Sequence, residues 1–151
     1  MIAVIQRVTT ARVIVDKKVI ASINTGMAIL LGVQKDDEEA DVNQLSEKIT
    51  SLRIFPNKNG QKEFDRSILD MKGEMLIISQ FTLLAHPWSG RRPDFSDAAT
   101  STRAKMLYES VANNVRMMGI PVKTGEFGAS MEVELVNDGP VTIVVDTRKL
   151  Y

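Results

Sequence analysis

The sequence predicts a single α+β domain, residues 1–151, in which a mixed, mainly antiparallel and barrel-like sheet carries two packed helices. Segments rich in β-branched residues alternate with two segments of helical periodicity, in the order strands, helix, strands, helix, strands. No long strand–helix–strand repeat is present, and no Gly-x-Gly-x-x-Gly follows a predicted strand, which argues against a doubly wound nucleotide-binding fold. A length of 151 residues suits one domain that buries its own apolar core.

Runs of β-branched and apolar residues mark the predicted strands. A turn is expected near residues 16–18, and another at residues 57–60. Residues 27–33 are continuously apolar, which indicates a buried strand. The last two strands alternate like the paired arms of a hairpin around Asn137-Asp138-Gly139-Pro140. The predicted strands are residues 2–8, 12–24, 27–33, 74–79, 131–137 and 141–146.

Two segments have the apolar spacing of amphipathic helices that pack one stripe on a sheet. The first follows the acidic residues 36–39, which suit the positive end of a helix dipole. The second runs from residue 96 or 97 to Met118, where Gly119 suits a helix C-cap and Pro121 prevents continuation. The predicted stripes are Val42, Leu45, Ile49 and Leu52 in the first helix, and Ala104, Leu107, Val111, Val115 and Met118 in the second.

Charge and composition limit the chemistry that the chain can perform. Its formal net charge is zero, so any contact with RNA must be made by a small local patch rather than by broad phosphate neutralisation. The absence of cysteine excludes disulfides, thiolate metal ligands and cysteine nucleophiles. A single histidine argues against zinc, and an all-carboxylate magnesium site stays open although no clustered Asp pattern points to one. We expect no metal and no cofactor.

The histidine and the chain's first residues support two further expectations. His86 lies in a loop, residues 85–95, and is interpreted as a surface residue rather than as a member of a catalytic triad. Residues 1–7 lack the basic region and long apolar stretch of a signal peptide. No apolar run approaches the roughly 18 residues of a membrane span. A cytoplasmic location is therefore expected, without a membrane partner.

Two polar segments are harder to explain as scaffold. Ser79-Gln80-Phe81-Thr82 places three polar side chains where an apolar strand ends, a position from which a rigid element can aim functional groups into a ligand site. The alternative is a strand that reaches the surface with solvated side chains. Residues 137–142, Asn-Asp-Gly-Pro-Val-Thr, are either a plain hairpin tip or a place where a cis Gly-Pro bond sits.

Together these segments resemble two signatures of the D-aminoacyl-tRNA deacylase family, Ser-Gln-Phe-Thr and Asn-x-Gly-Pro-Val-Thr. The resemblance extends to residues 1–8, 90–93 and 124–131, so it covers nearly the whole chain. It implies a homodimeric hydrolase that cleaves the ester between a D-amino acid and the terminal adenosine of tRNA. The chain departs from the family's usual residues at Asp94 and at residues 86–88, within the loop between the two signatures.

The resemblance also implies roles for individual residues. The amino-acid end would lie near residues 79–82, where, on chemical grounds alone, backbone amides around Phe81 and Thr82 could hold the developing oxyanion. A cis Gly139-Pro140 pair would enter the partner subunit's pocket, reject L-amino acids and admit glycine, with Arg7 fixing this segment. Phe127 and Met131 would hold the adenine. The implied catalytic residues are Ser79, Gln80, Phe81 and Thr82, and the implied substrate-binding residues are Gly139, Pro140, Phe127, Met131 and Asn137.

The sequence offers no obvious general base for this chemistry. An aminoacyl ester has a neighbouring ribose hydroxyl and is already activated, so positioning, electrostatic support and a water molecule can suffice. The rival mechanism makes Thr82 a covalent nucleophile, which needs a base that is not visible nearby. A different class of function is a non-catalytic dimer that binds a nucleotide or an RNA end, for which a neutral charge and a missing base are also expected.

Overall fold

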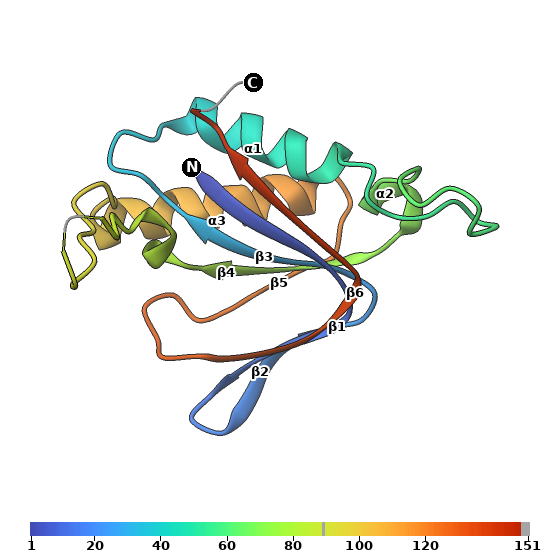
Figure 1. Cartoon of the computed structure of the whole chain (residues 1–151), viewed down its shortest axis with the longest axis horizontal. Helices are drawn as coiled ribbons and strands as arrows, with labels where there is room; N and C mark the ends of the chain where they lie inside the picture. The colour runs from blue at the N-terminus through green and yellow to red at the C-terminus, as the bar shows by residue number, and fades with distance from the viewer. Residues whose placement is uncertain (89, 149–151) are drawn as a thin grey trace.

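The structure, a computed structural model, describes residues 1–88 and 90–148. Residue 89 of the predicted 85–95 loop and residues 149–151 lie outside the described residues. The elements are β1 (Ile2–Val15), β2 (Lys18–Ile23), β3 (Gly26–Gly32), α1 (Glu39–Ser51), α2 (Ile68–Met71), β4 (Glu74–Ser79), the 3₁₀ helix η1 (Phe81–Leu84), α3 (Ser101–Met117), β5 (Val122–Thr124) and β6 (Glu132–Asp146). Figure 1 shows α1 and α3 lying on the same side of a curved sheet.

The long strand β1 organises the sheet, whose order in the described chain is β2-β1-β3-β4-β5 with β6 also paired to β1. Residues 2–8 of β1 pair with β3 and residues 11–15 pair with β2, while β6 runs antiparallel to β1 along nearly its whole length. β3, β4 and β5 are mutually parallel, so the sheet is mixed. Strands this long twist and bend, and β2 curls round to contact β4 and β5. The predicted α+β fold with a mixed, barrel-like sheet is therefore confirmed.

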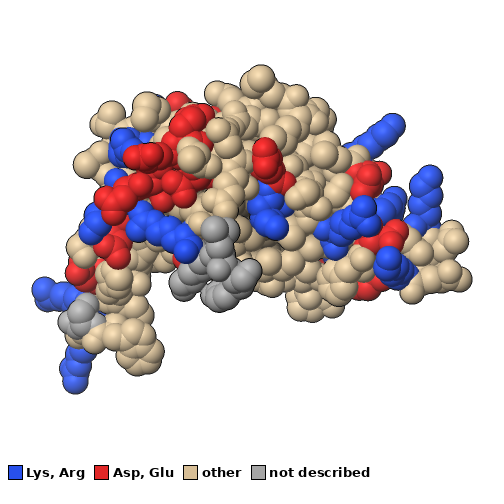
Figure 2. All heavy atoms as spheres, turned by 90° about the horizontal axis from the view of Figure 1, so that it is seen from above, with Lys and Arg blue, Asp and Glu red and all other residues tan. Residues whose placement is uncertain are grey.

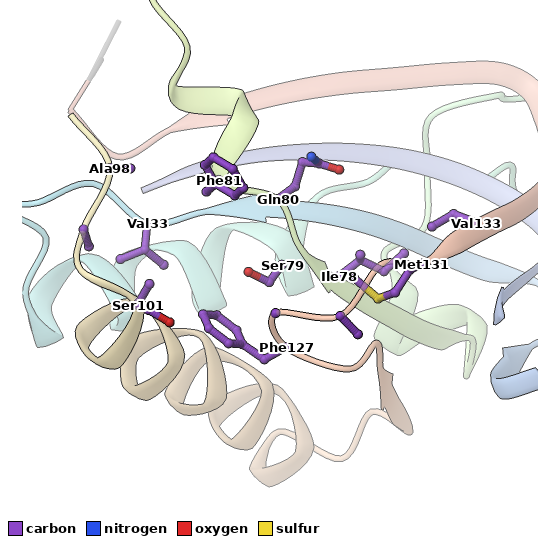
Figure 3. A pocket seen from close by; sticks show the side chains of 14 residues that line it. Val33, Ile78, Ser79, Gln80, Phe81, Ala98, Ser101, Phe127, Met131 and Val133 are labelled. Carbon is purple, nitrogen blue, oxygen red and sulfur yellow. The ribbon is translucent and has the colours of Figure 1, made fainter. Parts of the chain in front are cut away.

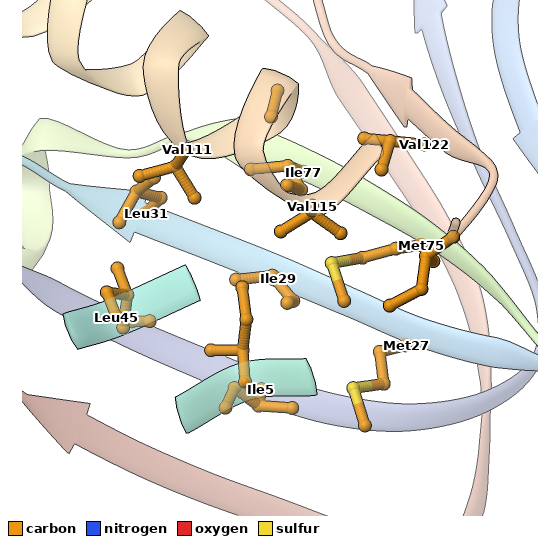
Figure 4. Close-up of a cluster of buried hydrophobic side chains, with 14 of the residues drawn as sticks. Ile5, Met27, Ile29, Leu31, Leu45, Met75, Ile77, Val111, Val115 and Val122 are labelled. Carbon is orange, nitrogen blue, oxygen red and sulfur yellow. The ribbon is translucent and has the colours of Figure 1, made fainter. Parts of the chain in front are cut away.

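Both faces of the central strands are covered, which explains their continuous apolar sequences. Successive side chains of a strand point to opposite faces. In β4, Met75 and Ile77 face the helices, whereas Leu76 and Ile78 belong to a second cluster inside the curl of the sheet. In the same way, Ile29 of β3 packs among helix residues (Figure 4). Burial of each such large side chain stabilises the fold by roughly 1.5–3 kcal/mol.

The predicted helices exist, but one starts later than the sequence predicts. α1 begins with a reciprocal capping box between Glu38 and Asp41. Of its predicted stripe, Val42, Leu45 and Ile49 are buried, whereas Leu52 is the partly buried C-cap. The expected start of α3 at residue 96 or 97 is wrong, because the Thr100 side chain accepts from the Arg103 amide and makes Thr100 the N-cap. Gly119, with φ of 90°, follows the last turn as predicted. None of the described helices is long and apolar enough to cross a bilayer.

Two small features of the fold differ in how well the sequence predicts them. The turn expected near residues 16–18 is confirmed, and Asp16 and Lys17 both have positive φ, 48° and 64°, as the tight turn of a twisted hairpin requires. The short helix α2 was not predicted, because four residues give too little periodicity to recognise. It is capped by Ser67, whose hydroxyl accepts from the Asp70 amide.

The hairpin predicted around residues 137–140 is wrong, because β6 is one strand and both of its halves pair with β1. Asn137 lies opposite Val8 and Thr142 lies opposite Gln6. The chain therefore advances five residues along β6 while it advances two along β1, and residues 138–141 bulge out of the ladder. An alternating pattern shows which face of a strand is apolar but not which strand it pairs with, so two arms with one common partner look like a hairpin.

Candidate active site

A pocket of about 460 Å³ opens beside the C-terminal end of β4. Ser79, Gln80 and Phe81 form one wall, and the segment from residue 127 to Met131 forms the wall across from it (Figure 3). Ala98 and Ala99, which precede α3, and Ser101 in its first turn close a third side. Segments that are distant in the sequence therefore enclose one cavity.

The β4 wall is built by a strand that stops and tightens into a 3₁₀ turn. The ladder continues to Gln80, whose amide donates to the Leu31 carbonyl at 2.8 Å, and η1 then turns the chain. The first amides of such a helix have no acceptor within the helix, so those of Phe81 and Thr82 are available to a ligand. Phe81 is 56% exposed and packs edge-on against Phe95 at 5.1 Å. Thr82 does not line the pocket, but its hydroxyl accepts from the side-chain amide of Gln80.

The opposite wall depends on contacts with α3 and β4. The ring of Phe127 packs at a tilt against Tyr108, with centroids 5.8 Å apart. Burial raises the pKa of the Tyr108 hydroxyl to about 12, so it stays protonated and donates to the Ile77 carbonyl at 2.7 Å. The amide of Gly125 donates to the same carbonyl at 3.1 Å. A Cβ on Gly125 would lie 2.7 Å from the sulfur of Met131, so glycine lets Met131 fold over the loop.

The second predicted segment lies elsewhere on the molecule. The Gly139-Pro140 bond is cis, as the resemblance implied, and both residues are exposed on β6. Arg7, whose side chain is 3% exposed, donates through Nε to the Asp138 carbonyl at 3.1 Å and so holds this segment. Gly139 has φ of 122°, and a Cβ there would lie 3.0 Å from Arg7 Nη2. Gly139, Pro140 and Asn137 do not line the pocket of their own chain.

Of the predicted site residues, the structure therefore brings Ser79, Gln80, Phe81, Phe127 and Met131 together around one pocket and leaves Thr82 just outside it. Sequence reasoning missed the wall formed by Ala98, Ala99 and Ser101, and the supporting Tyr108. A serine in the first turn of a helix carries the same sequence signal as an ordinary capping residue. A tyrosine within an amphipathic stripe looks like any other core residue.

The described pocket wall offers hydroxyl, amide, thioether and apolar groups, but no carboxylate, imidazole or amine. His86 is 49% exposed and lies outside the pocket wall, which confirms its interpretation as a surface residue. It bonds Asp97 at 2.7 Å, and Lys35 bonds the same carboxylate at 3.0 Å. The hydrogen bonds from Lys35 and then His86 lower the pKa of Asp97. Within residues 1–88 and 90–148, no three metal-ligating side chains converge.

Surface charge is mixed rather than basic. Figure 2 shows Lys and Arg interleaved with Asp and Glu over the face seen from above, without a broad basic area. This pattern agrees with the formal net charge of zero. A nucleic acid would find local rather than extended electrostatic attraction on this face.

Sequence comparisons give consistent matches. Residues 4–146 match the sequence model of a family described as D-Tyr-tRNA(Tyr) deacylase. A D-aminoacyl-tRNA deacylase of Thermosipho africanus is 49% identical over 151 residues, covering 100% of both chains. The protein of the same name from Aquifex aeolicus is 49% identical over 99% of this chain and 100% of its own. The one from Roseiflexus castenholzii is 53% identical over 97% of this chain and 92% of its own.

Two solved structures share the architecture. A structure titled c-Myc DNA Unwinding Element Binding Protein superposes with a TM-score of 0.92 at 38% identity, covering 97% of this chain and 98% of that one. A structure titled as a probable eukaryotic D-amino acid tRNA deacylase superposes with a TM-score of 0.84, covering 95% of this chain and 97% of that one. Its identity of 15% supports likeness of fold alone.

Proposed function

The chain belongs to the D-aminoacyl-tRNA deacylase family of ester hydrolases, and on that premise we propose that it removes D-amino acids from tRNA in the pocket beside β4. The observation that carries the proposal is the pairing of two walls around a cavity of about 460 Å³. One wall offers backbone amides and small polar groups, and the other offers Phe127 and Met131. Such a cavity suits a nucleoside that carries a small acyl group.

The chemical character of each wall suggests where each part of the substrate binds. Phe127 provides an aromatic face on which an adenine can stack, and Met131 provides a polarisable thioether beside it. The ester would then lie against the end of β4, where the amides of Phe81 and Thr82 can donate to the oxygen that becomes negative as water adds to the carbonyl carbon. The bond to the ribose oxygen breaks next, and that oxygen takes a proton as the amino acid leaves.

We favour attack by water, assisted by the neighbouring ribose hydroxyl, over a covalent intermediate on Thr82. The hydroxyl oxygen of Thr82 accepts from the Gln80 amide, and an amide is not a base. The described lining also lacks a carboxylate or imidazole that could take a proton from Thr82. In this mechanism the neighbouring ribose hydroxyl of the substrate assists the attacking water in place of a protein side chain.

We further propose that a second copy of the chain completes the pocket. Gly139 and Pro140 are exposed and do not line their own pocket, so they are available to enter the pocket of another copy. The same strand exposes Val136 and Val144 by 56% and 66%, apolar side chains that a second copy can cover. Sedimentation at micromolar concentration is expected to show a dimer, and a fully active monomer would contradict this arrangement.

The inserted segment would then select the configuration of the amino acid by exclusion. Its carbonyl oxygens can accept from the substrate's α-ammonium. With the ammonium and the ester both held, an L-side chain would point into the backbone of the inserted segment, while a D-side chain would point outward. Exclusion of this kind tolerates many D-side chains and also admits glycine, which has no side chain to collide.

The experiment that tests the function is release of free amino acid from matched D- and L-aminoacyl-tRNA by the pure protein. We expect rapid release from the D-form, release from glycyl-tRNA, and little release from the L-form. Tight binding of tRNA ends without release would instead indicate a non-catalytic nucleic-acid binder.

A further inference from the structure

The outer face of α3 borders two hollows beyond the pocket described above. The first, about 530 Å³, shares Ser101 with the active-site pocket, and the second, about 520 Å³, shares Phe127 with it. The two hollows share Lys105, Glu109 and Asn113 with each other. They therefore form one continuous surface beside the active site. We call this surface the α3 track and define it by Ser101, Lys105, Glu109, Asn113 and Arg116.

The track follows from helix geometry. Its residues recur at intervals of four and then three, which places them on one face of a helix. All five are exposed, while the buried stripe of α3 faces the sheet. From Lys105 to Arg116 the track spans about 16 Å at the usual helical rise of about 1.5 Å per residue. A ligand that contacts both cations must therefore be extended along the helix.

The chemistry of the track suits a single-stranded nucleotide segment. Lys105 and Arg116 can contact phosphates, and Lys105 is held only at 3.9 Å by Glu109 with both side chains more than half exposed. Arg116 donates to Asn113 Oδ1 at 2.9 Å, which orients its guanidinium along the helix. The carboxylate of Glu126 can accept from the exocyclic amine of a base. Lys105 and Arg116 lie beside the carboxylates of Glu109 and Glu126, so the attraction for phosphate is local to the two cations.

We propose that the α3 track binds the nucleotides that precede the terminal adenosine of tRNA. The proposal rests on the proposed function, because it assumes that the terminal adenosine occupies the pocket with its base on Phe127. Since Phe127 also borders the second hollow, a strand that leaves the adenosine on this side enters the track directly. Lys105 and Arg116 then contact its phosphates, and they contribute to affinity rather than to the chemical step.

The test compares two substrates that differ only in the preceding nucleotides, D-aminoacyl-tRNA and D-aminoacyl-adenosine. Lys105→Ala and Arg116→Ala are each expected to raise KM for the tRNA substrate several-fold without changing kcat. The logarithm of KM should depend less steeply on the logarithm of salt concentration, by about 0.7 for each single-strand phosphate that the variant no longer neutralises. Cleavage of D-aminoacyl-adenosine should keep its wild-type kinetics.

Two further variants make the result specific to the track. Lys48→Ala removes an exposed cation from α1, outside the hollows, and is expected to leave KM for tRNA unchanged. Glu109→Gln removes a negative charge from the track and is expected to lower KM, the opposite direction to the lysine and arginine variants. Thermal unfolding should show that all four variants fold like the wild type.

The outcomes separate this proposal from the proposed function. Wild-type cleavage of both substrates, with equal losses on both for Lys105→Ala and Arg116→Ala, would overturn the track and leave the function intact. An unchanged KM and salt dependence for tRNA would overturn it as well. If the wild type releases amino acid from neither substrate, the proposed function fails and the track proposal fails with it.

Discussion

The end of β4 and the middle of β6 carry similar sequence signals but differ in their place in the molecule. Residues 79–82 span the end of a strand covered on both faces and the turn after it, and three of them line a pocket enclosed by their own chain. Residues 137–142 lie on an exposed strand and contribute nothing to that pocket. A short polar motif beside apolar strands can therefore mark a site that one chain builds alone or a surface that it presents to another molecule. Four predictions test this distinction.

The largest expected effect concerns the β4 site and its missing base. A substrate that ends in 2′-deoxyadenosine should be cleaved roughly 100- to 1,000-fold more slowly at saturation, because a positioned proton-transfer group contributes about 10²–10⁴-fold to such reactions. The measurement is single-turnover release of D-amino acid from both substrates. Equal rates would show that the protein supplies the whole catalytic set.

The next effect concerns β6. Gly139→Ala should lower kcat/KM for D-aminoacyl-tRNA on the order of 100-fold, the scale of a small misplacement of catalytic geometry. The new Cβ would lie 2.9 Å from Val141 Cγ2 and 3.0 Å from Arg7 Nη2, at a φ of 122° that side chains rarely adopt. Gly60→Ala is the matched control, because its φ is 68° and nothing lies within 4 Å of the added atom. Unchanged activity and unchanged chiral selection in Gly139→Ala would remove β6 from the site.

A smaller effect is expected at the edge of the β4 site. Thr82→Ala should lower kcat by less than about tenfold, because its hydroxyl lies at the edge of the site and takes no part in the chemical step. Loss of a central catalytic group would instead lower kcat about a thousandfold or more. Pre-steady-state kinetics and mass spectrometry on the wild type provide the check. A thousandfold loss together with a trapped acyl-enzyme would establish Thr82 as the nucleophile.

The smallest expected effect is a partial recovery of activity in mixed dimers, which compares the β4 pocket with β6 directly. Ala129→Trp should fill the pocket of its own chain, since Ala129 lies on the pocket wall, and it leaves β6 intact. Gly139→Ala leaves the pocket intact. Mixed dimers of these two impaired variants form half of a random mixture and contain one working site of two, so activity should return to about a quarter of the wild-type level. No recovery after confirmed subunit exchange would show that each pocket uses its own β6.

Much of the fold could be predicted because it depends on local patterns. The apolar run of β3, the buried stripe of α1 and the glycine after α3 each reflect a property of one segment. The predictions were wrong where a local sequence pattern does not specify the element with which a segment pairs. The alternation in β6 indicates an apolar face, but pairing with β1 rather than with itself depends on the whole sheet. α3 starts later than predicted because Thr100, rather than one of the polar residues before it, caps the helix.

The sequence by itself determined which segments carry chemistry, the family to which the chain belongs, and the lack of any cysteine and of more than one histidine. Only the tertiary structure decided that Ser79 and Phe127 line the same cavity and that Gly139 lies outside it. The physical reason is that residue types and their spacing act over a few positions, through propensity, capping and burial of one face. The meeting of distant segments depends on how β1 pairs with three strands at once, which no single segment encodes.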